Sequence, residues 1–419
     1  MESPIDPAIF RALFHVLVGG AALASLYSVY HQKYDIENTM GETFTRLKKA
    51  KSNDEKETVL MEMLSLIQND AAKKKASSRL SAVKLGDQLV KLVKLQKDGS
   101  NAEVVSAAIK AIVRVFGADA AGRSRLHAYG GYKALLATLS EAHRQGNEDL
   151  MEEVADALVQ LTEVNDEDLL TSADIPPGAE GCHALATMPA VVKMLRIIDE
   201  SSPVLFLNAV TGIYANMTMF AAGAKNIGKG TDGHSGISFF LKLLEHSNRG
   251  VVENSVRTVR YIIRTNIGTE EVCKQENVER LASLFTSNGS VIVLNSVMTI
   301  LLIMMAADEH GEEFYKNVNE TNILVTLFEL YVRHADRSVR SRAEALCSFL
   351  LRAKHTSEKV ATLTERYRSQ ILQRQEKDKE EQQRQMQQMQ QQQMMQRMMM
   401  EQMGIDPSMM MDLNNTCYG

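Results

Sequence analysis

The chain has 419 residues and a mass of 46.6 kDa, and its 45% of apolar residues exclude wholesale disorder. Aromatic residues make up 5% and Trp is absent, which argues against a pocket built on stacked rings. The chain has only seven prolines, which favours long helices. A net charge of −5 excludes the generally basic surface of a nucleic-acid-binding protein. The four cysteines form no close pair, which indicates reduced, mostly structural thiols and a cytosolic main domain.

The first apolar segment covers residues 12–30 and carries no formal charge over its 19 positions. As a helix rising about 1.5 Å per residue it would reach about 28 Å, close to the hydrocarbon thickness of a bilayer. It predicts a single N-terminal transmembrane helix within residues 1–34, followed by a linker at 35–54. The predicted anchor residues are Leu13, Phe14, Val16, Leu17, Val18, Gly20, Leu23, Ala24, Leu26, Tyr27 and Tyr30.

The charges that flank this segment predict its orientation. A basic cluster at 46–51 follows it, whereas Arg11 alone precedes it among basic residues, so the positive-inside bias places the long C-terminal part in the cytosol. Two alternatives stay open. The segment could be a signal peptide cleaved near the small residues at 22–24, or a buried first helix of the soluble domain.

Residues 55–355 repeat one unit, in which a short apolar helix and a polar break precede a longer apolar helix. The units are predicted to open 45, 58, 47, 42 and 44 residues apart, at Gly86, Gly131, Pro189, Gly236, Val278 and Asn322. An insertion at 175–178 explains the long interval. The longer helices have apolar residues every three or four positions on more than one face, as expected for a helix packed between neighbouring repeats. Because no stretch alternates like a strand, the fold is predicted to be all-α.

A period of about 40–47 residues with two or three helices is the signature of armadillo and HEAT repeats. The stretches GGYKALLATLSE…LMEEVADALVQLTE and SGISFFLKLLEHSNRGVVENSVRTVRYII resemble the second and third helices of the armadillo family. The resemblance covers roughly residues 55–355 and implies an armadillo-type α-solenoid, an interaction scaffold whose third helices line a concave groove. Importin-like members bind basic peptides with a ladder of Trp and Asn. This chain has no Trp, and only Asn216 falls at a plausible ladder position, which argues against an importin-type role.

Two short motifs bear on catalysis, and both are weak. Residues 223–230, GAKNIGKG, resemble a phosphate-binding loop, but Gly230 replaces the hydroxyl residue that would bind magnesium and no strand precedes it. We therefore interpret this segment as a Gly-rich surface loop. Cys182 and His183 are adjacent without a third group nearby, and we interpret them as a loop pair. The sequence predicts no enzyme, no metal site and no cofactor.

Charge points to the candidate binding surface. Residues 140–200 hold 14 acidic and three basic side chains, whereas residues 46–97 hold 13 basic and six acidic ones. A groove with sectors of both signs could bind peptides of either sign, and a solvated outer face is the alternative for each cluster. The candidate peptide-binding residues are Glu152, Glu153, Asp156 and Glu163 in the acidic sector, Asn216, and the helix-spaced Arg257, Arg260 and Arg264.

The C-terminal tail, residues 356–419, is rich in Gln and Met. Eleven of the 23 Met lie between residues 386 and 411. The tail is predicted to be partly helical or disordered, with a polar helix over 366–385 and no apolar heptad that would support a coiled coil. Alternatively its Met side chains form an adaptable surface for varied apolar partners.

An N-terminal anchor followed by a cytosolic armadillo domain resembles the armadillo receptor subunits of the archaic outer-membrane translocase of kinetoplastid mitochondria. The resemblance rests on domain order and size. It implies an import receptor of the mitochondrial outer membrane, with the armadillo domain facing the cytosol. Such a receptor would bind mitochondrial precursor proteins and pass them to a β-barrel translocase pore, with sister receptor subunits as partners and cytosolic chaperones as further candidates. The alternative is a membrane-tethered armadillo cochaperone, nucleotide-exchange factor or adaptor.

Overall fold

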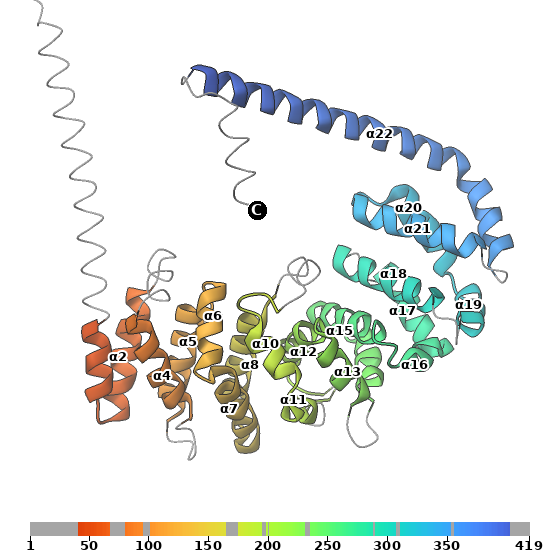
Figure 1. Ribbon diagram of the computed structural model, residues 1–419. Coiled ribbons are helices and arrows are strands. Elements are labelled where there is room, and N and C mark those ends of the chain that lie inside the picture. Colours follow the sequence, from red (N-terminus) through yellow and green to blue (C-terminus); the bar gives the residue numbers. More distant parts are fainter. Residues whose placement is uncertain are drawn as a thin grey trace, which may run out of the picture. The chain divides into compact units, whose positions relative to one another are not determined.

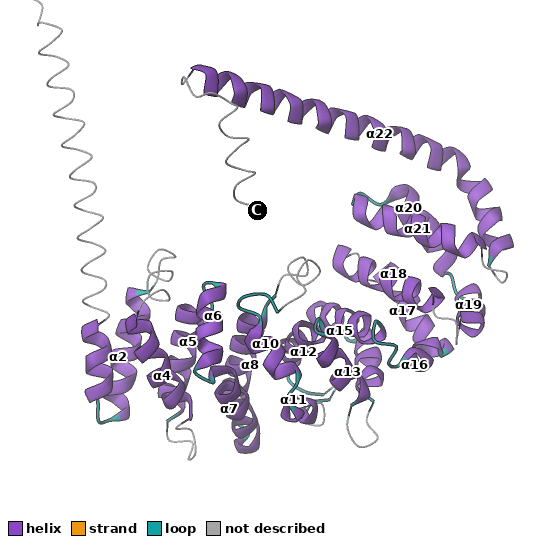
Figure 2. Cartoon of the chain, in the orientation of Figure 1, coloured by secondary structure: helices purple, strands orange, loops and turns teal. Residues whose placement is uncertain are grey.

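The computed structural model describes residues 41–67, 80–94, 101–164, 175–194, 198–199, 201–230, 235–287, 290–306, 311–352 and 356–402. Over these ranges the backbone forms helices and connecting turns without a strand, which confirms the all-α prediction (Figure 2). The transmembrane helix predicted at 12–30 lies outside the described residues. Within the described part of the chain, every helix is too short or too polar to cross a bilayer.

The chain divides into two compact units, Met1–Leu281 and Ala282–Gly419. In the first unit a helical stretch at 41–49 is followed by α2 to α17, the last of which ends beyond the boundary. Their bounds are α2 Asn53–Leu66, α4 Leu80–Lys94, α5 Ala102–Phe116, α6 Ala120–Ala128, α7 Gly131–Gln145, α8 Glu148–Thr162, α10 Glu180–Ala186, α11 Pro189–Met194, α12 Val204–Thr218, α13 Ala221–Lys229, α14 Gly236–Lys242, the 3₁₀ helix η1 Leu243–Glu245, α15 Arg249–Ile263, α16 Thr269–Cys273 and α17 Gln275–Ser287.

Successive helices form repeats in which a short first helix and a second helix precede a long third helix. The triplets α6–α7–α8, α10–α11–α12 and α13–α14–α15 show this order (Figure 1). The third helices α2, α5, α8, α12 and α15 each pack beside the next one along the chain. This arrangement explains why α12 is apolar around most of its circumference, since helices on both sides cover it.

Polar caps and left-handed glycines set the ends of the third helices. Asn147 accepts a hydrogen bond from the Leu150 amide at the start of α8, and Asn248 accepts bonds from the Gly250 and Val251 amides at the start of α15. Gly146, with φ of +67°, ends α7 and turns the chain into α8, a conformation that favours glycine. The starts of α8 and α15 are therefore encoded locally in the sequence.

Some predicted openings need correction. Gly131, Pro189 and Gly236 begin their helices and Asn322 directly precedes α20, but α17 begins at Gln275 rather than at Val278. Gly86 lies inside α4 instead of opening a helix. A β-carbon at Gly86 would come within 3 Å of the rings of Phe116 and Tyr129. This glycine therefore serves close packing, not a helix start.

The short first helices were missed, and two interpretations of loops were wrong for that reason. The segment 223–230, which we interpret from sequence as a surface loop, lies in α13 up to Lys229, and the Cys182–His183 pair lies in α10. Both helices are short and contain Gly and Ala, so they have too few large apolar residues to indicate a helix in the sequence. Gly223 packs against the Met217 carbonyl and Gly228 against Ile262, which shows that these glycines allow close packing rather than phosphate binding.

The second unit contains α18 Val291–Ala306, α19 Gly311–Glu320, α20 Ile323–Arg333, α21 Arg337–Arg352 and α22 Ser357–Gln402. The polar helix predicted over 366–385 lies within α22. The first part of α22 packs on α20 and α21, where Val360, Leu363 and Tyr367 are buried. The Tyr367 ring stacks on Phe328 of α20, with ring centroids 5.9 Å apart. The helical core of this unit thus includes the beginning of the tail.

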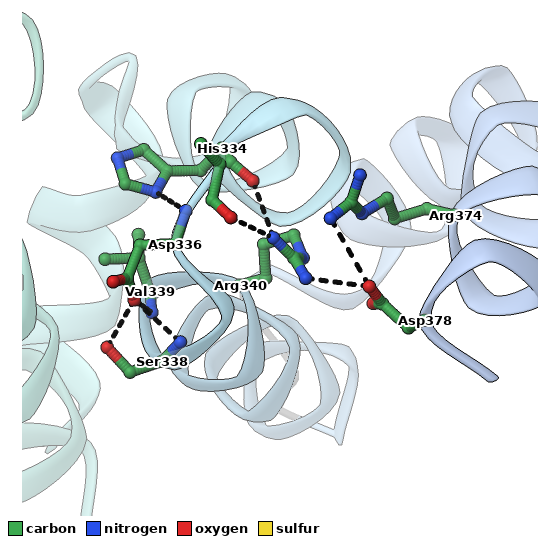
Figure 3. Close-up of polar contacts among 8 residues, drawn as sticks. His334, Asp336, Ser338, Val339, Arg340, Arg374 and Asp378 are labelled. Atoms are coloured by element: carbon green, nitrogen blue, oxygen red, sulfur yellow. Dashed lines mark hydrogen bonds and ion pairs between the residues drawn. The ribbon is translucent and has the colours of Figure 1, made fainter. Parts of the chain in front are cut away.

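An ionic cluster marks the point where α22 leaves this core (Figure 3). Arg340, which is 3% exposed, donates through Nη1 to the carbonyls of His334 and Ala335 at 2.9 and 2.6 Å. Its Nη2 donates to Asp378 of α22 at 2.7 Å, and Arg374 Nη2 contacts the same carboxylate at 3.3 Å. After Asp378, every side chain that the structure describes on α22 is exposed. The distal half of the helix therefore has no packing partner within the described residues.

The packed start of α22 predicts a stability difference between two tail variants. We expect Tyr367→Ala to lower the free energy of unfolding of the second unit by about 3 kcal/mol, because it removes a buried ring. Leu372→Ala is the matched control on the same helix, because Leu372 is 58% exposed. Urea titration followed by hydrogen exchange at the amides of α20 and α21 measures the difference. Equal effects of the two changes would show that α22 does not pack as described.

Candidate peptide-binding groove

A groove with a volume of about 680 Å³ runs over the third helices of the first unit. Helix α8 and the two residues after it contribute Asp149, Glu152, Glu153, Asp156, Val159, Gln160, Glu163 and Val164. Helix α12 contributes Leu205, Asn208, Ala209, Gly212 and Asn216, while Lys110 comes from α5 and Asn254 and Arg257 come from α15. Four neighbouring third helices therefore build one site.

The period of α8 places acidic side chains on its groove face. Leu150, Val154, Leu158 and Leu161 point into the core and are buried, which leaves the alternate face to Asp149, Glu152, Asp156 and Glu163. Acidic residues in the first turn, Glu148 and Asp149, also complement the positive end of the helix dipole. The apolar stripe that holds α8 in the fold thus fixes the direction of its carboxylates.

Most of these carboxylates have no charge partner of their own. Glu153 contacts Lys110 Nζ at 3.3 Å, and Asp156 accepts a hydrogen bond from Gln160 at 2.7 Å. Within the described residues, Asp149, Glu152 and Glu163 form no ion pair or side-chain hydrogen bond. The α8 wall of the groove therefore carries uncompensated negative charge that a cationic ligand could neutralise.

The asparagines of the groove are used to connect the third helices. Asn216 is 5% exposed, and its Nδ2 donates to Thr162 Oγ1 at 3.1 Å and to the Val159 carbonyl at 3.3 Å. One repeat further on, Asn254 Nδ2 donates to the carbonyl of Asn208 at 3.1 Å. Asn216 thus lies in the groove, as its predicted ladder position requires, but its amide donor group binds α8.

The three predicted arginines of α15 separate into two locations. Arg257 lines the groove, half-buried. The guanidinium groups of Arg260 and Arg264 lie over the ring of Tyr261, at 4.4 and 5.1 Å from its centroid, and are not among the groove-lining residues. Arg257 is therefore the arginine that the structure brings together with the predicted acidic residues Glu152, Glu153, Asp156 and Glu163.

Sequence reasoning missed several lining residues. Asp149 could have been found, since it lies one turn before Glu152 on the same helix face. Leu205 and Asn254 could not, because only the structure shows that Leu205 is 67% exposed and that Asn254 reaches across to α12. Lys110 is separated from Glu153 by 43 positions along the chain, so their ion pair carries no local signal.

The Cys182–His183 pair has no reactive geometry. Cys182 is completely buried, and burial raises the pKa of its thiol far above the usual range. The His183 ring instead packs edge-on against Phe220, with centroids 5.3 Å apart. In the part of the chain that the structure describes, no group of three or more His, Cys, Asp or Glu residues is arranged to hold a metal ion.

Comparison with solved structures identifies the fold. A chain from a structure of the interaction between cadherin and beta-catenin matches with a TM-score of 0.55 and 15% identity, over 77% of this chain and 63% of that chain. The present chain thus spans less than two thirds of that relative. Two designed armadillo-repeat proteins, the second in complex with peptide (KR)4, match at 16% and 15% identity with TM-scores of 0.47 and 0.42, each over 63% of this chain and 98% of theirs. No protein family model and no curated protein matches the chain.

The likeness to the beta-catenin structure shows an armadillo-type fold, as the repeat pattern predicted. In this chain the groove lies on the third helices.

The buried thiols give a chemical test of this site description. Burial raises the pKa of Cys347 to about 12 and that of Cys182 further, so the reactive thiolate is scarce at pH 8. In a Cys417→Ser background we therefore expect Cys182, Cys273 and Cys347 to resist iodoacetamide until urea unfolds the protein. Mass spectrometry of the alkylated peptides measures this. Rapid labelling of Cys182 in the folded protein would contradict the buried α10 geometry.

Proposed function

We propose that this chain is a non-enzymatic armadillo scaffold that binds basic, amphipathic segments of other proteins in the α8–α12–α15 groove. The observation that carries the proposal is the row of carboxylates on α8 that have no ionic partner among the described residues. Proteins of this fold are typically binding scaffolds, which supports the general role. The charge of the groove supports the choice of a basic ligand.

The groove also offers apolar contacts to the other face of such a ligand. Leu205 at the start of α12 is 67% exposed, and Val159 of α8 and Ala209 of α12 are half-buried. When a ligand buries an exposed leucine in a concave site, the free energy of binding becomes more favourable by about 25 cal/mol for each Å² of apolar surface removed from water. A segment with a basic face and an apolar face therefore complements both walls.

The more specific form of the proposal is a receptor for mitochondrial precursor proteins at the outer mitochondrial membrane. Mitochondrial presequences are basic and amphipathic, which matches the groove. The apolar segment at 12–30 would anchor the chain, and the basic cluster at 46–51 would keep the armadillo domain in the cytosol. The domain order and size resemble those of the translocase receptor subunits. This resemblance implies that the chain passes precursors to a β-barrel pore and works with sister subunits.

Charge reversal in the groove tests ligand binding. We expect Glu152→Lys with Asp156→Lys to weaken binding of a fluorescent presequence peptide about tenfold at low ionic strength, because attraction is replaced by repulsion. Fluorescence anisotropy over a range of salt concentrations measures the loss, which should shrink as salt rises.

The matched control is Glu276→Lys with Glu279→Lys on α17. Both side chains are exposed and neither lines the groove, yet the net charge changes by the same amount. The control variant should bind the peptide nearly as tightly as the unchanged protein. Equal losses in the two variants would assign the effect to overall charge and remove the groove from the proposal.

Membrane topology tests the receptor form of the proposal. With a C-terminal epitope tag on the chain in isolated mitochondria, we expect the tag to stay with the membrane after alkaline carbonate extraction. External protease should remove it. Release into the soluble fraction, or absence from mitochondria, would exclude the receptor.

The same preparation separates the receptor from the cochaperone alternative. Affinity purification of a receptor should recover precursor proteins and pore subunits. An exchange factor should recover a chaperone alone and accelerate its nucleotide release.

A further inference from the structure

We infer that the groove binds its ligand as an α-helix lying along α8, with successive cations three, four and seven residues apart, and not as an extended strand. This inference rests on the proposed function and specifies the conformation of the ligand. Three features of the groove lead to it: the use of its amide groups, the direction of its acidic wall and the shape of its opposite wall.

Three of the four side-chain amides that line the groove already donate hydrogen bonds within the protein. An extended ligand exposes backbone groups that need partners, and a groove for strands supplies them from side chains. Here Asn216 Nδ2 donates to Thr162 and Val159, Asn254 Nδ2 donates to Asn208, and Gln160 Nε2 donates to Asp156. A helical ligand needs no such partners, because its backbone hydrogen bonds are made within the helix.

The acidic wall follows the axis of one helix. Asp149, Glu152, Asp156 and Glu163 all belong to α8 or its C-cap, instead of being distributed one per repeat. At about 1.5 Å of rise per residue they extend over about 21 Å, with successive intervals of about 4.5, 6 and 10.5 Å. A ligand helix of about four turns, with cations at positions i, i+3, i+7 and i+14, repeats these intervals. Residues on the same face of a strand recur about every 6.6 Å, so a strand does not repeat these intervals.

The opposite wall, α12, runs beside this row. Asn216 contacts Val159 and Thr162, so α12 lies next to α8 along the groove. Exposed Leu205 marks one end, and the small residues Ala209 and Gly212 follow on the same face at helical spacing. The small side chain of Ala209 allows a ligand helix to approach closely, and Leu205 would contact the apolar face of that helix. The groove therefore fits a ligand helix whose basic side faces α8 and whose apolar side faces α12.

Three peptides of equal length and charge test this inference with the full-length protein. The first is a 15-residue peptide with Arg at positions 1, 4, 8 and 15, Leu on the neighbouring helical face and aminoisobutyrate elsewhere to promote helix. The second alternates the same Arg and Leu residues and replaces aminoisobutyrate with Thr, which suits a strand. A third is the first peptide with one central aminoisobutyrate replaced by Pro, which breaks the helix but keeps every charge.

We expect the helical peptide to bind about tenfold more tightly than either control peptide in fluorescence anisotropy, since the controls lose the match to α8 or the helix itself. Carbon-13 chemical shifts of the labelled peptide should report helix in the complex. Equal or tighter binding by the alternating peptide, or extended shifts in the complex, would overturn the inference.

The Glu152→Lys and Asp156→Lys double variant separates this result from a failure of the proposed function. If all peptides bind equally and all lose affinity in that variant, the groove binds basic ligands and the helical inference is wrong. If no peptide loses affinity in that variant, the proposed function and the inference both fail.

Discussion

The structure of the first unit depends on the side-by-side packing of its third helices. Each of these helices must bury apolar residues against two neighbours, which leaves one narrow face for solvent. Amide hydrogen bonds from Asn216 to α8 and from Asn254 to α12 fix neighbouring third helices relative to one another. The groove is the set of remaining faces, so the packing that stabilises the repeats also determines which side chains a ligand meets.

Sequence alone could predict the third helices because they are long, apolar on several faces and preceded by capping residues such as Asn147 and Asn248. It could not predict α10 and α13, because seven and nine residues with several Gly and Ala contain too few large apolar residues to indicate a helix. The sequence also could not predict the role of Gly86 in close packing. Its close approach to Phe116 and Tyr129 depends on residues that are distant in sequence.

The candidate site could be predicted in part for the same reason. The acidic face of α8 follows from helical period, and the structure places Glu152, Glu153, Asp156 and Glu163 together with Asn216 and Arg257. Period alone cannot show that Arg260 and Arg264 lie against Tyr261, because that depends on where the helix ends and how its last turn packs. Nor can it show that the Asn216 amide is occupied, which is a contact between repeats.

The acidic row on α8 is not explained by helix stability. Carboxylates in the first turn, such as Asp149, complement the positive end of the helix dipole. Glu163 is the C-cap, where the dipole is negative and a carboxylate is unfavourable, and the last turn of α8 contains no basic residue. A scaffold selected for stability alone would place Lys or Arg there. Glu163 therefore ends the row that faces the groove at a position that the helix dipole does not favour, and this position agrees with the cationic ligand that we propose.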